Sequence, residues 1–290
     1  IDVEGGLQIP GVARDLVGRP QVRAGGEGVR GALRGHLGRP EGDVAGARKA
    51  FIASRFNNLD VLLEQRFGWM RDHLKPDDVI VEFGCGAGFS RLYLNHPGLI
   101  LTDVLENEWV DRNADAMNPP FDPGSVDVII CSHMIHHMAK PVTFFAKVRS
   151  ILRPGGRIII QDLETSLMMR LMLYAMRHEG WSYDIDVFDE NAVTNDPKDP
   201  WSANCAIPEL LFRDSAEFER RVPGYKVTKN ELNECTLFPL SGGVIAKTPV
   251  PQLPRFLLAG FRALDKVLVK IAPGVFAVGR SVVLTKQAEN

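Results

Sequence analysis

The sequence lacks any continuous apolar stretch long enough to cross a bilayer. Its 290 residues contain no run of eighteen uncharged apolar residues, and we expect no signal peptide at its start. A membrane-spanning helix needs about 20 predominantly apolar residues, and a secretory leader combines a charged start with an apolar core. We therefore expect a cytoplasmic protein.

Paired cysteines and an excess of positive charge are also missing. No two of the four cysteines form a Cys-x-x-Cys pair, which argues against a disulfide or zinc framework and predicts reduced thiols. The 34 Lys and Arg residues face 36 Asp and Glu residues, a net charge of −2, so we expect no nucleic-acid partner. The length suffices for one large α/β domain with additions.

Residues 1–47 differ from the rest of the chain in composition. They hold twelve of the 27 glycines, interspersed with arginines, and sustain no apolar period beyond a predicted short helix around residues 29–37. A Gly/Arg segment can bind RNA, but no aromatic residues are interleaved for base stacking. We predict a loosely structured extension, with the alternative of a functional arm left open, and a main domain over residues 48–290.

A glycine-rich turn after a buried strand is the most informative motif. The β-branched run Val79–Val81 predicts the strand. It is followed by Glu82 and then by three alternate glycines, Gly84, Gly86 and Gly88. A strand, a glycine turn and a helix let the backbone approach a nucleotide-like ligand closely. The dinucleotide fingerprint Gly-x-Gly-x-x-Gly does not fit, because Phe89 and Arg91 occupy its third glycine position in the two possible registers. This disfavours a nucleotide-dependent oxidoreductase.

Two aspartates follow the glycine turn at informative places. Asp103 ends the next apolar run, Leu99–Thr102, where a carboxylate at the carboxyl edge of a sheet can accept both hydroxyl protons of a ribose. The alternative for Asp103 is a turn aspartate. Asp115 follows after a connection too short for a full helix and strand, so we expect a tight turn over residues 106–109 and a short strand over residues 110–114.

These motifs, with the helix 141–152 and the Arg153–Gly156 turn before an isoleucine-rich strand, resemble the class I S-adenosylmethionine-dependent methyltransferases of type 11. The resemblance covers about residues 78–162. It implies a Rossmann-like, doubly wound α/β sheet of about seven strands, the last antiparallel, with helical and lid insertions. It also implies that Asp115 hydrogen-bonds the adenine amino group; otherwise Asp115 caps a turn. The cofactor-binding residues it implies are Glu82, Phe83, Gly84, Cys85, Gly86, Gly88, Asp103, Asp115, Ala116, Met117 and Ser132.

Three histidines follow the predicted fourth strand, Ser125–Cys131, at the sheet edge where ligands bind. Histidine titrates near neutral pH, and we predict His133 first and His137 second as catalytic bases, four residues apart on one helical face. The alternative is that these histidines cap the helix or pack beneath the loop. We expect no metal site, because no glutamate follows the first histidine and no third ligand is apparent.

The rest of the chain predicts elements around the acceptor. A helix over residues 48–73, ended by Pro76, mostly packs on the sheet and carries the lesser site candidates Phe56, Asn57, Asn58 and Trp69. A lid insertion spans about residues 163–224, with a methionine-rich helix (163–178) and a substrate lid (180–206). A helix over 208–221 and a strand over 225–238 follow.

A second insertion, about residues 241–275, precedes a final strand over 276–284. Its helix, Leu253–Ile271, is amphipathic, and Arg255, Arg262, Lys266 and Lys270 line one face. This pattern suggests contact with an anionic membrane surface or a lipid-linked substrate. The alternative is a helix packed on its own sheet with solvated cations.

The sequence thus predicts an enzyme that transfers methyl from S-adenosylmethionine to a small-molecule or lipid- or glycan-linked acceptor in biosynthesis, on oxygen. The alternatives are methylation of nitrogen or carbon of a soluble metabolite, and a binding module without turnover. The oligomeric state is left open.

Overall fold

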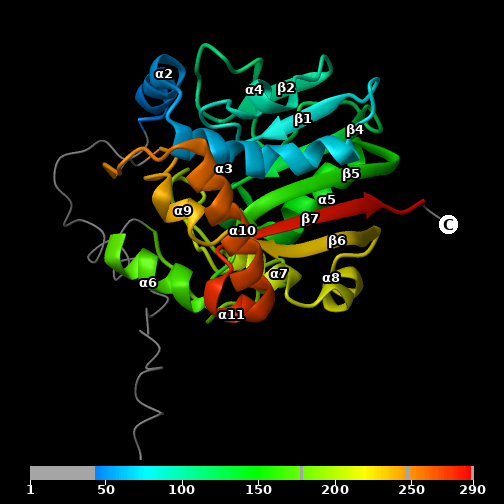
Figure 1. Ribbon diagram of the computed structural model, residues 1–290. Helices are drawn as coiled ribbons and strands as arrows, with labels where there is room; N and C mark the ends of the chain where they lie inside the picture. The colour runs from blue at the N-terminus through cyan, green and yellow to red at the C-terminus, as the bar shows by residue number, and fades with distance from the viewer. Residues whose placement is uncertain (1–42, 177–178, 246–247, 289–290) are drawn as a thin grey trace, which may run out of the picture. The chain divides into compact units, whose positions relative to one another are not determined.

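The structure is a computed structural model that describes residues 43–176, 179–245 and 248–288 (Figure 1). Its centre is a seven-stranded sheet with the order β3-β2-β1-β4-β5-β7-β6. The strands are β1 (Ile80–Phe83), β2 (Leu99–Asp103), β3 (Arg112–Asn113), β4 (Val126–Ser132), β5 (Leu152–Leu163), β6 (Tyr225–Asn233) and β7 (Gly279–Lys286).

Strand direction confirms the predicted doubly wound fold. β3, β2, β1, β4 and β5 pair in parallel, whereas β7 runs antiparallel to both β5 and β6. The carboxyl ends of β1, β2, β4 and β5 therefore meet at one edge of the sheet, where ligands bind in open α/β sheets.

Helices cover the sheet. They are α2 (Val44–Ser54), α3 (Asn57–Gly68), η1 (Trp69–His73), α4 (Ser90–Leu94), η2 (Ile135–His137), α5 (Pro141–Ile151), α6 (Leu167–Met176), α7 (Ile207–Phe212), α8 (Ser215–Arg221), α9 (Leu237–Leu240), α10 (Arg255–Ile271) and α11 (Pro273–Phe276).

Successive side chains of each strand alternate between the two faces of the sheet, which explains why helices pack on both faces. Val81 and Ile129 join a core with Phe145 of α5, whereas the neighbouring Ile80 and Ile130 join a second core with residues of α2 and α3. Successive side chains of a strand point to opposite faces, so apolar residues at every position bury the sheet on both sides.

Several predicted bounds are wrong, each for a local reason. The helix expected over residues 48–73 is broken at Arg55, which has a left-handed φ of 42° and separates α2 from α3. The helix expected over 208–221 breaks where the Asp214 side chain accepts from Ala216 N and Glu217 N and starts α8. The strand expected over 225–238 ends at Asn233, the helix expected from 163 begins at Leu167, and β7 begins only after α11.

Three helices, α9, α10 and α11, come between β6 and β7 in the sequence, although these two strands pair directly in the sheet. Buried Asp265 of α10 accepts hydrogen bonds from the backbone N–H groups of Cys235, Thr236 and Leu237, which fastens α10 to the start of α9. Among the described residues, no helix combines the length and apolarity needed to span a membrane.

At the N-terminal side, α2 begins at Val44, so the domain boundary expected between residues 47 and 48 falls inside a helix. The predicted Gly/Arg-rich extension up to residue 42, with its short helix at 29–37, lies outside the described residues. All four cysteines are free and buried.

Candidate active site

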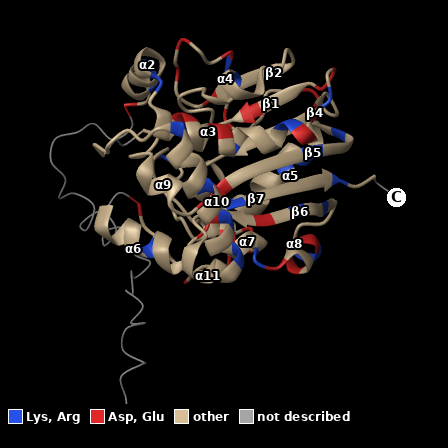
Figure 2. Cartoon of the chain, viewed as in Figure 1, with Lys and Arg blue, Asp and Glu red and all other residues tan. Residues whose placement is uncertain are grey.

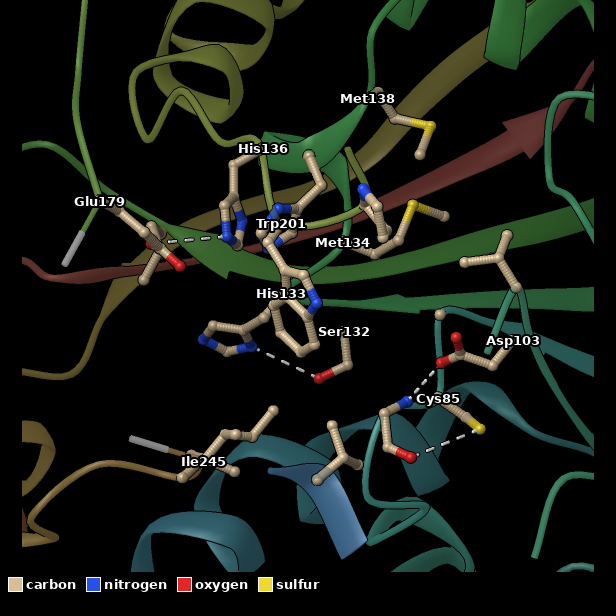
Figure 3. Close-up of a pocket in the computed structure, with 18 of the residues that line it drawn as sticks. Cys85, Asp103, Ser132, His133, Met134, His136, Met138, Glu179, Trp201 and Ile245 are labelled. Atoms are coloured by element: carbon tan, nitrogen blue, oxygen red, sulfur yellow. Dashed lines mark hydrogen bonds and ion pairs between the residues drawn. The ribbon is translucent and has the colours of Figure 1, made fainter. Parts of the chain in front are cut away.

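A pocket of about 880 Å³ lies at the carboxyl edge of the sheet. Cys85 and Asp103 line one side, Glu179 and Ile245 the other, and the Ser132–His136 segment lies between them (Figure 3). The glycine turn after β1 and the histidine turn after β4 are thus brought to one cavity by two neighbouring parallel strands.

The glycine turn leaves space for a ligand at Gly86. Gly86 has a φ of 50°, and a Cβ built there would meet no atom within 4 Å. By contrast, a Cβ at Gly84 would lie 2.7 Å from the Met134 side chain. Backbone conformation favours glycine at both positions, since Gly84 has a φ of 66°, and packing also requires it at 84, whereas Gly86 lines the pocket with open space beside it.

Asp103, at the end of β2, lines the pocket next to this turn. Its Oδ2 accepts from Gly86 N at 2.8 Å and its Oδ1 from Leu105 N at 2.9 Å. Each carboxylate oxygen has two lone pairs, so Asp103 retains acceptor capacity for hydroxyl donors. The turn role and the predicted ribose role are compatible.

Glu82 is buried below the glycine turn and accepts a hydrogen bond from the Ser90 hydroxyl. Burial raises the pKa of Glu82 to about 8, opposed by the Ser90 hydrogen bond and reinforced by the negative charge of Asp103. The pocket therefore holds a carboxyl group that is largely protonated at neutral pH.

Two residues that hold the turn were not predicted as site residues. The Trp109 indole donates to Gly86 O at 2.8 Å, and the Arg48 guanidinium donates to Ala87 O at 2.6 Å while lying 4.8 Å from the Trp109 ring centre. Arg48 is 39 residues from its partner, so only the fold reveals the contact.

The predicted adenine-side residues Asp115, Ala116 and Met117 line the pocket. Asp115 is exposed and accepts from Met117 N at 2.8 Å and from the Asn118 amide at 3.0 Å, so it does cap its turn. Two other predicted cofactor residues are placed elsewhere. Phe83 is fully buried in the core, and Gly88 is covered by Trp109, to which a Cβ would come within 2.5 Å.

The histidine turn is organised by Asp162 at the end of β5. Its Oδ2 accepts from Ile135 N at 2.8 Å, and its Oδ1 lies 2.5 Å from His136 Nδ1. Burial alone would raise the pKa of Asp162, but the adjacent His136 lowers it below its ordinary value. Burial alone would lower the pKa of His136, but Asp162 and Glu179 together raise it. Asp162 was not predicted as a site residue. The sequence signal that could have identified it is its position directly after a predicted strand.

His133 and His137 do not share a helical face, contrary to the prediction. His133 precedes η2, has a φ of 53° and donates its backbone N–H to Gln161 O at 2.7 Å. Both still line the pocket. His133 Nε2 is buried without a hydrogen-bond partner among the described residues, and its Nδ1 lies 3.5 Å from Ser132 Oγ.

Both of these imidazoles are neutral at physiological pH. Burial, followed by the charge of Arg66, holds the pKa of His133 well below its usual range. Burial and the charge of His136 lower the pKa of His137 to about 4. Each can therefore present an unprotonated nitrogen to the pocket.

The segment predicted as a lid is fastened to the histidine turn. Asn204 N donates to His136 O at 2.9 Å, the Asn195 amide donates to the same oxygen at 2.8 Å, and His137 Nδ1 lies 3.1 Å from Ser202 O. Trp201 of this segment lines the pocket. The lid function itself stays a prediction.

The side of the pocket away from the glycine turn is apolar. Its lining residues come from α6, α9 and the segment that follows α9 and include Met169, Met172, Leu173, Met176, Phe238, Val244 and Ile245. Methionine fills irregular apolar space and adapts to varied partners, so this wall suits an acceptor with an apolar body.

None of the four lesser candidates lines the pocket. The buried Asn58 amide donates to Leu240 O and Pro251 O and fastens the segment before α10 to α3. The Trp69 indole donates to Gln161 Oε1 at 3.2 Å. Asn58 therefore stabilises the packing of the segment before α10, and neither Asn58 nor Trp69 contributes to the cavity wall.

The residues present fit S-adenosylmethionine. The space beside Gly86, the acceptor capacity of Asp103 and residues 115–117 line one cavity, and hydroxyl and amino groups of a nucleoside could be bound by these carboxylates and the backbone. His133, whose Nε2 is buried without a hydrogen-bond partner among the described residues, also lines this cavity.

Comparison with known proteins agrees with this geometry. Residues 81–160, from β1 to β5, match the family model described as a methyltransferase domain. The fold is similar to that of a SAM dependent methyltransferase from Archaeoglobus fulgidus, with a TM-score of 0.51, 16% identity, and coverage of 82% of this chain and 99% of that one. The matched segment contains the glycine turn, Asp103 and the histidine turn, so the family match and the pocket residues coincide.

Curated relatives are similar over the same region. A ubiquinone biosynthesis O-methyltransferase of Cupriavidus pinatubonensis is 28% identical over 139 residues, which is 41% of this chain and 55% of that protein. A highly reducing polyketide synthase of Aspergillus luteorubrus is 32% identical over 62 residues, 21% of this chain and 2% of that protein. The chain thus spans about half of the first relative and a small part of the second.

Proposed function

We propose that this protein transfers a methyl group to an oxygen atom of an acceptor with a large apolar part. The observation that carries the proposal is the two-ended pocket, with the glycine turn and Asp103 at one end and neutral histidines beside a methionine wall at the other. Similarity to an O-methyltransferase supports oxygen as the acceptor atom.

When bound, S-adenosylmethionine would supply a methyl group activated by a positively charged sulfur, with a neutral thioether as the leaving group. The chain's own residues position the acceptor and remove its proton. His133 Nε2 accepts the hydroxyl hydrogen, and the proton lost by the oxygen passes to this nitrogen. Such proton transfer typically contributes about 10²–10⁴ in rate, and alignment of the reactants contributes roughly 7–11 kcal/mol.

Calorimetric titration with S-adenosylhomocysteine tests the cofactor end. Wild type is expected to bind at micromolar concentration, and Asp103→Ala to lose binding. Gly86→Ala is expected to weaken binding at least tenfold, because its methyl group enters the cradle. The matched control is Gly124→Ala, with a φ of 64° and equally open surroundings in the turn before β4, which is expected to bind normally. Wild-type affinity in Gly86→Ala would contradict the placement.

The acceptor side is tested by turnover with phenolic and hydroxylated lipids of graded chain length. Transfer to oxygen that His133→Ala lowers at least a hundredfold, with S-adenosylhomocysteine affinity unchanged, is the expected result. Binding of S-adenosylhomocysteine without transfer to any oxygen, nitrogen or carbon acceptor would favour the alternative of a binding module.

A lipid-linked acceptor is favoured by the outer surfaces of α6 and α10. Large apolar side chains are exposed on α6 (Leu171, Tyr174) and on α10 (Phe256, Val267, Ile271). The opposite side of α6 carries the methionines that line the pocket, so this helix separates the cavity from the exposed apolar surface.

The charges beside this surface suit an anionic membrane. Arg262, Lys266 and Lys270 are exposed on α10, and its only acidic residue, Asp265, is buried. Figure 2 shows α6 with basic but no acidic colour, which agrees with Arg170 as its single charged residue. Apolar side chains flanked by cations are typical of helices that lie in a membrane interface.

Co-sedimentation with vesicles tests this surface. Vesicles containing phosphatidylserine are expected to retain the wild type, and Arg262→Glu with Lys266→Glu to abolish retention. The control reverses two exposed lysines elsewhere, Lys75 and Lys147. Equal retention of both double variants, or none of the wild type, would contradict membrane contact through α10.

A further inference from the structure

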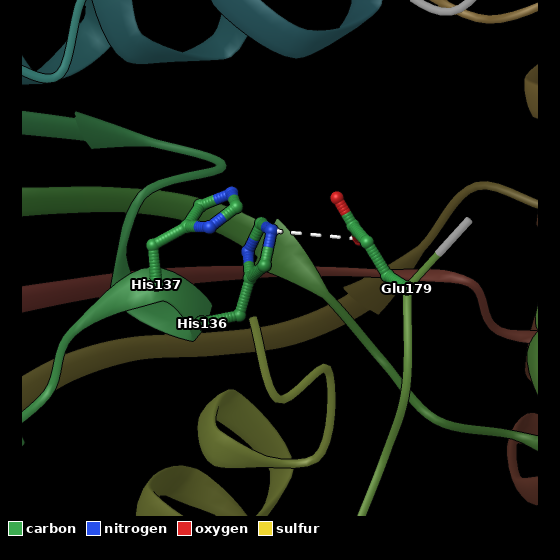
Figure 4. Close-up of side chains that lie close together, drawn as sticks. All are labelled: His136, His137 and Glu179. Atoms are coloured by element: carbon green, nitrogen blue, oxygen red, sulfur yellow. Dashed lines mark ion pairs between the residues drawn. The ribbon is translucent and has the colours of Figure 1, made fainter. Parts of the chain in front are cut away.

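Three side chains from two distant segments meet on the acceptor side of the pocket. His136 and His137 belong to η2, and Glu179 follows α6 (Figure 4). One donor atom from each lies within 4.8 Å of the other two, and His136 Nε2 is 3.8 Å from Glu179 Oε2. All three line the cavity.

In both histidines Nδ1 contacts a protein oxygen, which leaves Nε2 directed toward the other ligands. His136 Nδ1 faces Asp162 Oδ1 at 2.5 Å, and His137 Nδ1 faces the carbonyl oxygen of Ser202 at 3.1 Å. A carbonyl can only accept, so His137 carries its hydrogen on Nδ1 and its lone pair on Nε2. Metal-ligating histidines almost always donate their other N–H to a carboxylate or carbonyl in this way.

The third side chain is also held in place. The Cys205 thiol donates to Glu179 Oε2 at 3.2 Å, Cys205 N donates to Gly180 O at 2.9 Å, and Gly180 forms a β-bridge with Asn204. The segment that carries Glu179 is thus fastened to the segment that carries Ser202. The structure supplies the third ligand that the local sequence around the histidines lacked.

We propose that His136, His137 and Glu179 bind a divalent transition-metal ion whose open coordination positions face the acceptor end of the pocket. Two histidines and one carboxylate are a ligand set of catalytic Zn²⁺ and of open Fe²⁺ sites. Metal–ligand bonds of about 2.0–2.2 Å place the donor atoms roughly 3.3 Å apart, so the half-buried His137 and Glu179 side chains close on the ion by small rotations.

In the proposed reaction the metal ion acts as a Lewis acid on the acceptor oxygen. This role rests on the proposed function. A Lewis acid polarises an oxygen that it binds and lowers the pKa of that oxygen's proton. The acceptor hydroxyl then gives its proton to His133 more readily, while its lone pair forms the bond to the methyl carbon and the S–C electron pair remains on sulfur. Neutral His133 alone is a weak base. A metal ion that lowers the pKa of the acceptor hydroxyl makes proton transfer to His133 easier.

Metal binding by the full chain tests the site without relying on turnover. Chelator-treated protein is titrated separately with Zn²⁺, Mn²⁺, Fe²⁺ under anaerobic conditions, and Mg²⁺, and Co²⁺ is added to follow its visible absorption. One equivalent of Zn²⁺ or Fe²⁺ is expected to bind, with Mg²⁺ at least a hundredfold weaker because it prefers oxygen ligands.

Glu179→Gln and His137→Gln are expected to weaken binding at least a hundredfold and to change the Co²⁺ spectrum. Glu190→Gln, an exposed acid of the same lid segment, and His96→Gln, a histidine before β2, are the matched controls and are expected to bind normally. Stoichiometric binding that survives in Glu179→Gln, or no binding in wild type, would overturn the metal site.

S-adenosylhomocysteine titration of the same variants separates this outcome from the proposed function. Unchanged nucleoside affinity in Glu179→Gln and His137→Gln shows that the fold and cofactor end are intact, so lost metal binding is assigned to the ligands. If wild type bound metal but no S-adenosylhomocysteine, the proposed function would fail and the metal site would stand.

Discussion

At the scale of single residues, the pocket depends on groups whose ordinary chemistry is changed by burial. Glu82 is a carboxyl kept protonated, and His133 and His137 are imidazoles kept neutral. Perturbed groups that converge on one cavity are typical of functional sites. Asp162 has the opposite role, since it stays ionised and orients the turn.

Glu82 predicts a pH dependence of stability. Its pKa is about 8 in the folded protein against 4.5 ordinarily, so the folded state holds the proton more tightly. The stabilisation is complete below about pH 4.5 and is lost as the pH rises through 8. Glu82→Gln keeps an acceptor for Ser90 without this titration.

Urea unfolding at pH 5, 6, 7 and 8 measures the effect. As the pH rises, wild type is expected to lose stability relative to Glu82→Gln. The difference between their free energies of unfolding should change by up to about 1.4 kcal/mol per pH unit across this range. Glu190→Gln serves as the control and is expected to follow wild type. Parallel curves for Glu82→Gln and wild type would show that Glu82 titrates normally.

At the scale of elements, buried polar links fasten the insertions to the parent sheet. The Arg66 guanidinium of α3 binds Glu234, just after β6, through Nε–Oε1 at 2.9 Å and Nη2–Oε2 at 2.7 Å. Both side chains are at most 3% exposed. This bidentate pair joins the helix before β1 to the start of the α9–α11 insertion.

Arg66→Met is expected to lower the free energy of unfolding by about 3–5 kcal/mol, because Glu234 is left as an uncompensated buried charge. Chemical denaturation provides the measurement. Arg220→Met removes an exposed pair with Glu217 and is expected to cost less than about 1 kcal/mol. Arg66→Met with Glu234→Gln is expected to recover part of the loss, and failure to recover would point to lost packing instead.

At the scale of the whole molecule, the cavity connects β1, β2, β4, the segment after α6 and the segment after α9. A ligand that binds there is bound only by the folded chain. Ligand binding therefore stabilises the whole described domain by mass action.

S-adenosylhomocysteine at 100 times its Kd is expected to add about 2.7 kcal/mol to the free energy of unfolding. For a chain of this size the melting temperature should rise by roughly 5–10 °C. Differential scanning calorimetry measures the shift, with NAD⁺ at the same concentration as the control. A shift with NAD⁺ and none with S-adenosylhomocysteine would revive the oxidoreductase hypothesis.

The sequence by itself determined the parallel half of the sheet and the glycine-turn end of the pocket. Short continuous apolar runs, β-branched strands and the spacing of Gly84, Gly86 and Asp103 are local signals, and the carboxyl ends of parallel strands must meet at one edge. Gly84 and Asp103 are 19 positions apart, so short connections fix where these residues lie.

Only the tertiary structure decided the histidine end of the pocket. The left-handed His133 donates its backbone N–H to Gln161 O on β5, a tertiary partner that propensity does not encode. Glu179 reaches His136 across 43 positions because the lid segment docks on η2, and Arg48 reaches the glycine turn from α2. Contacts between distant segments are set by packing of whole elements, and no local pattern records them.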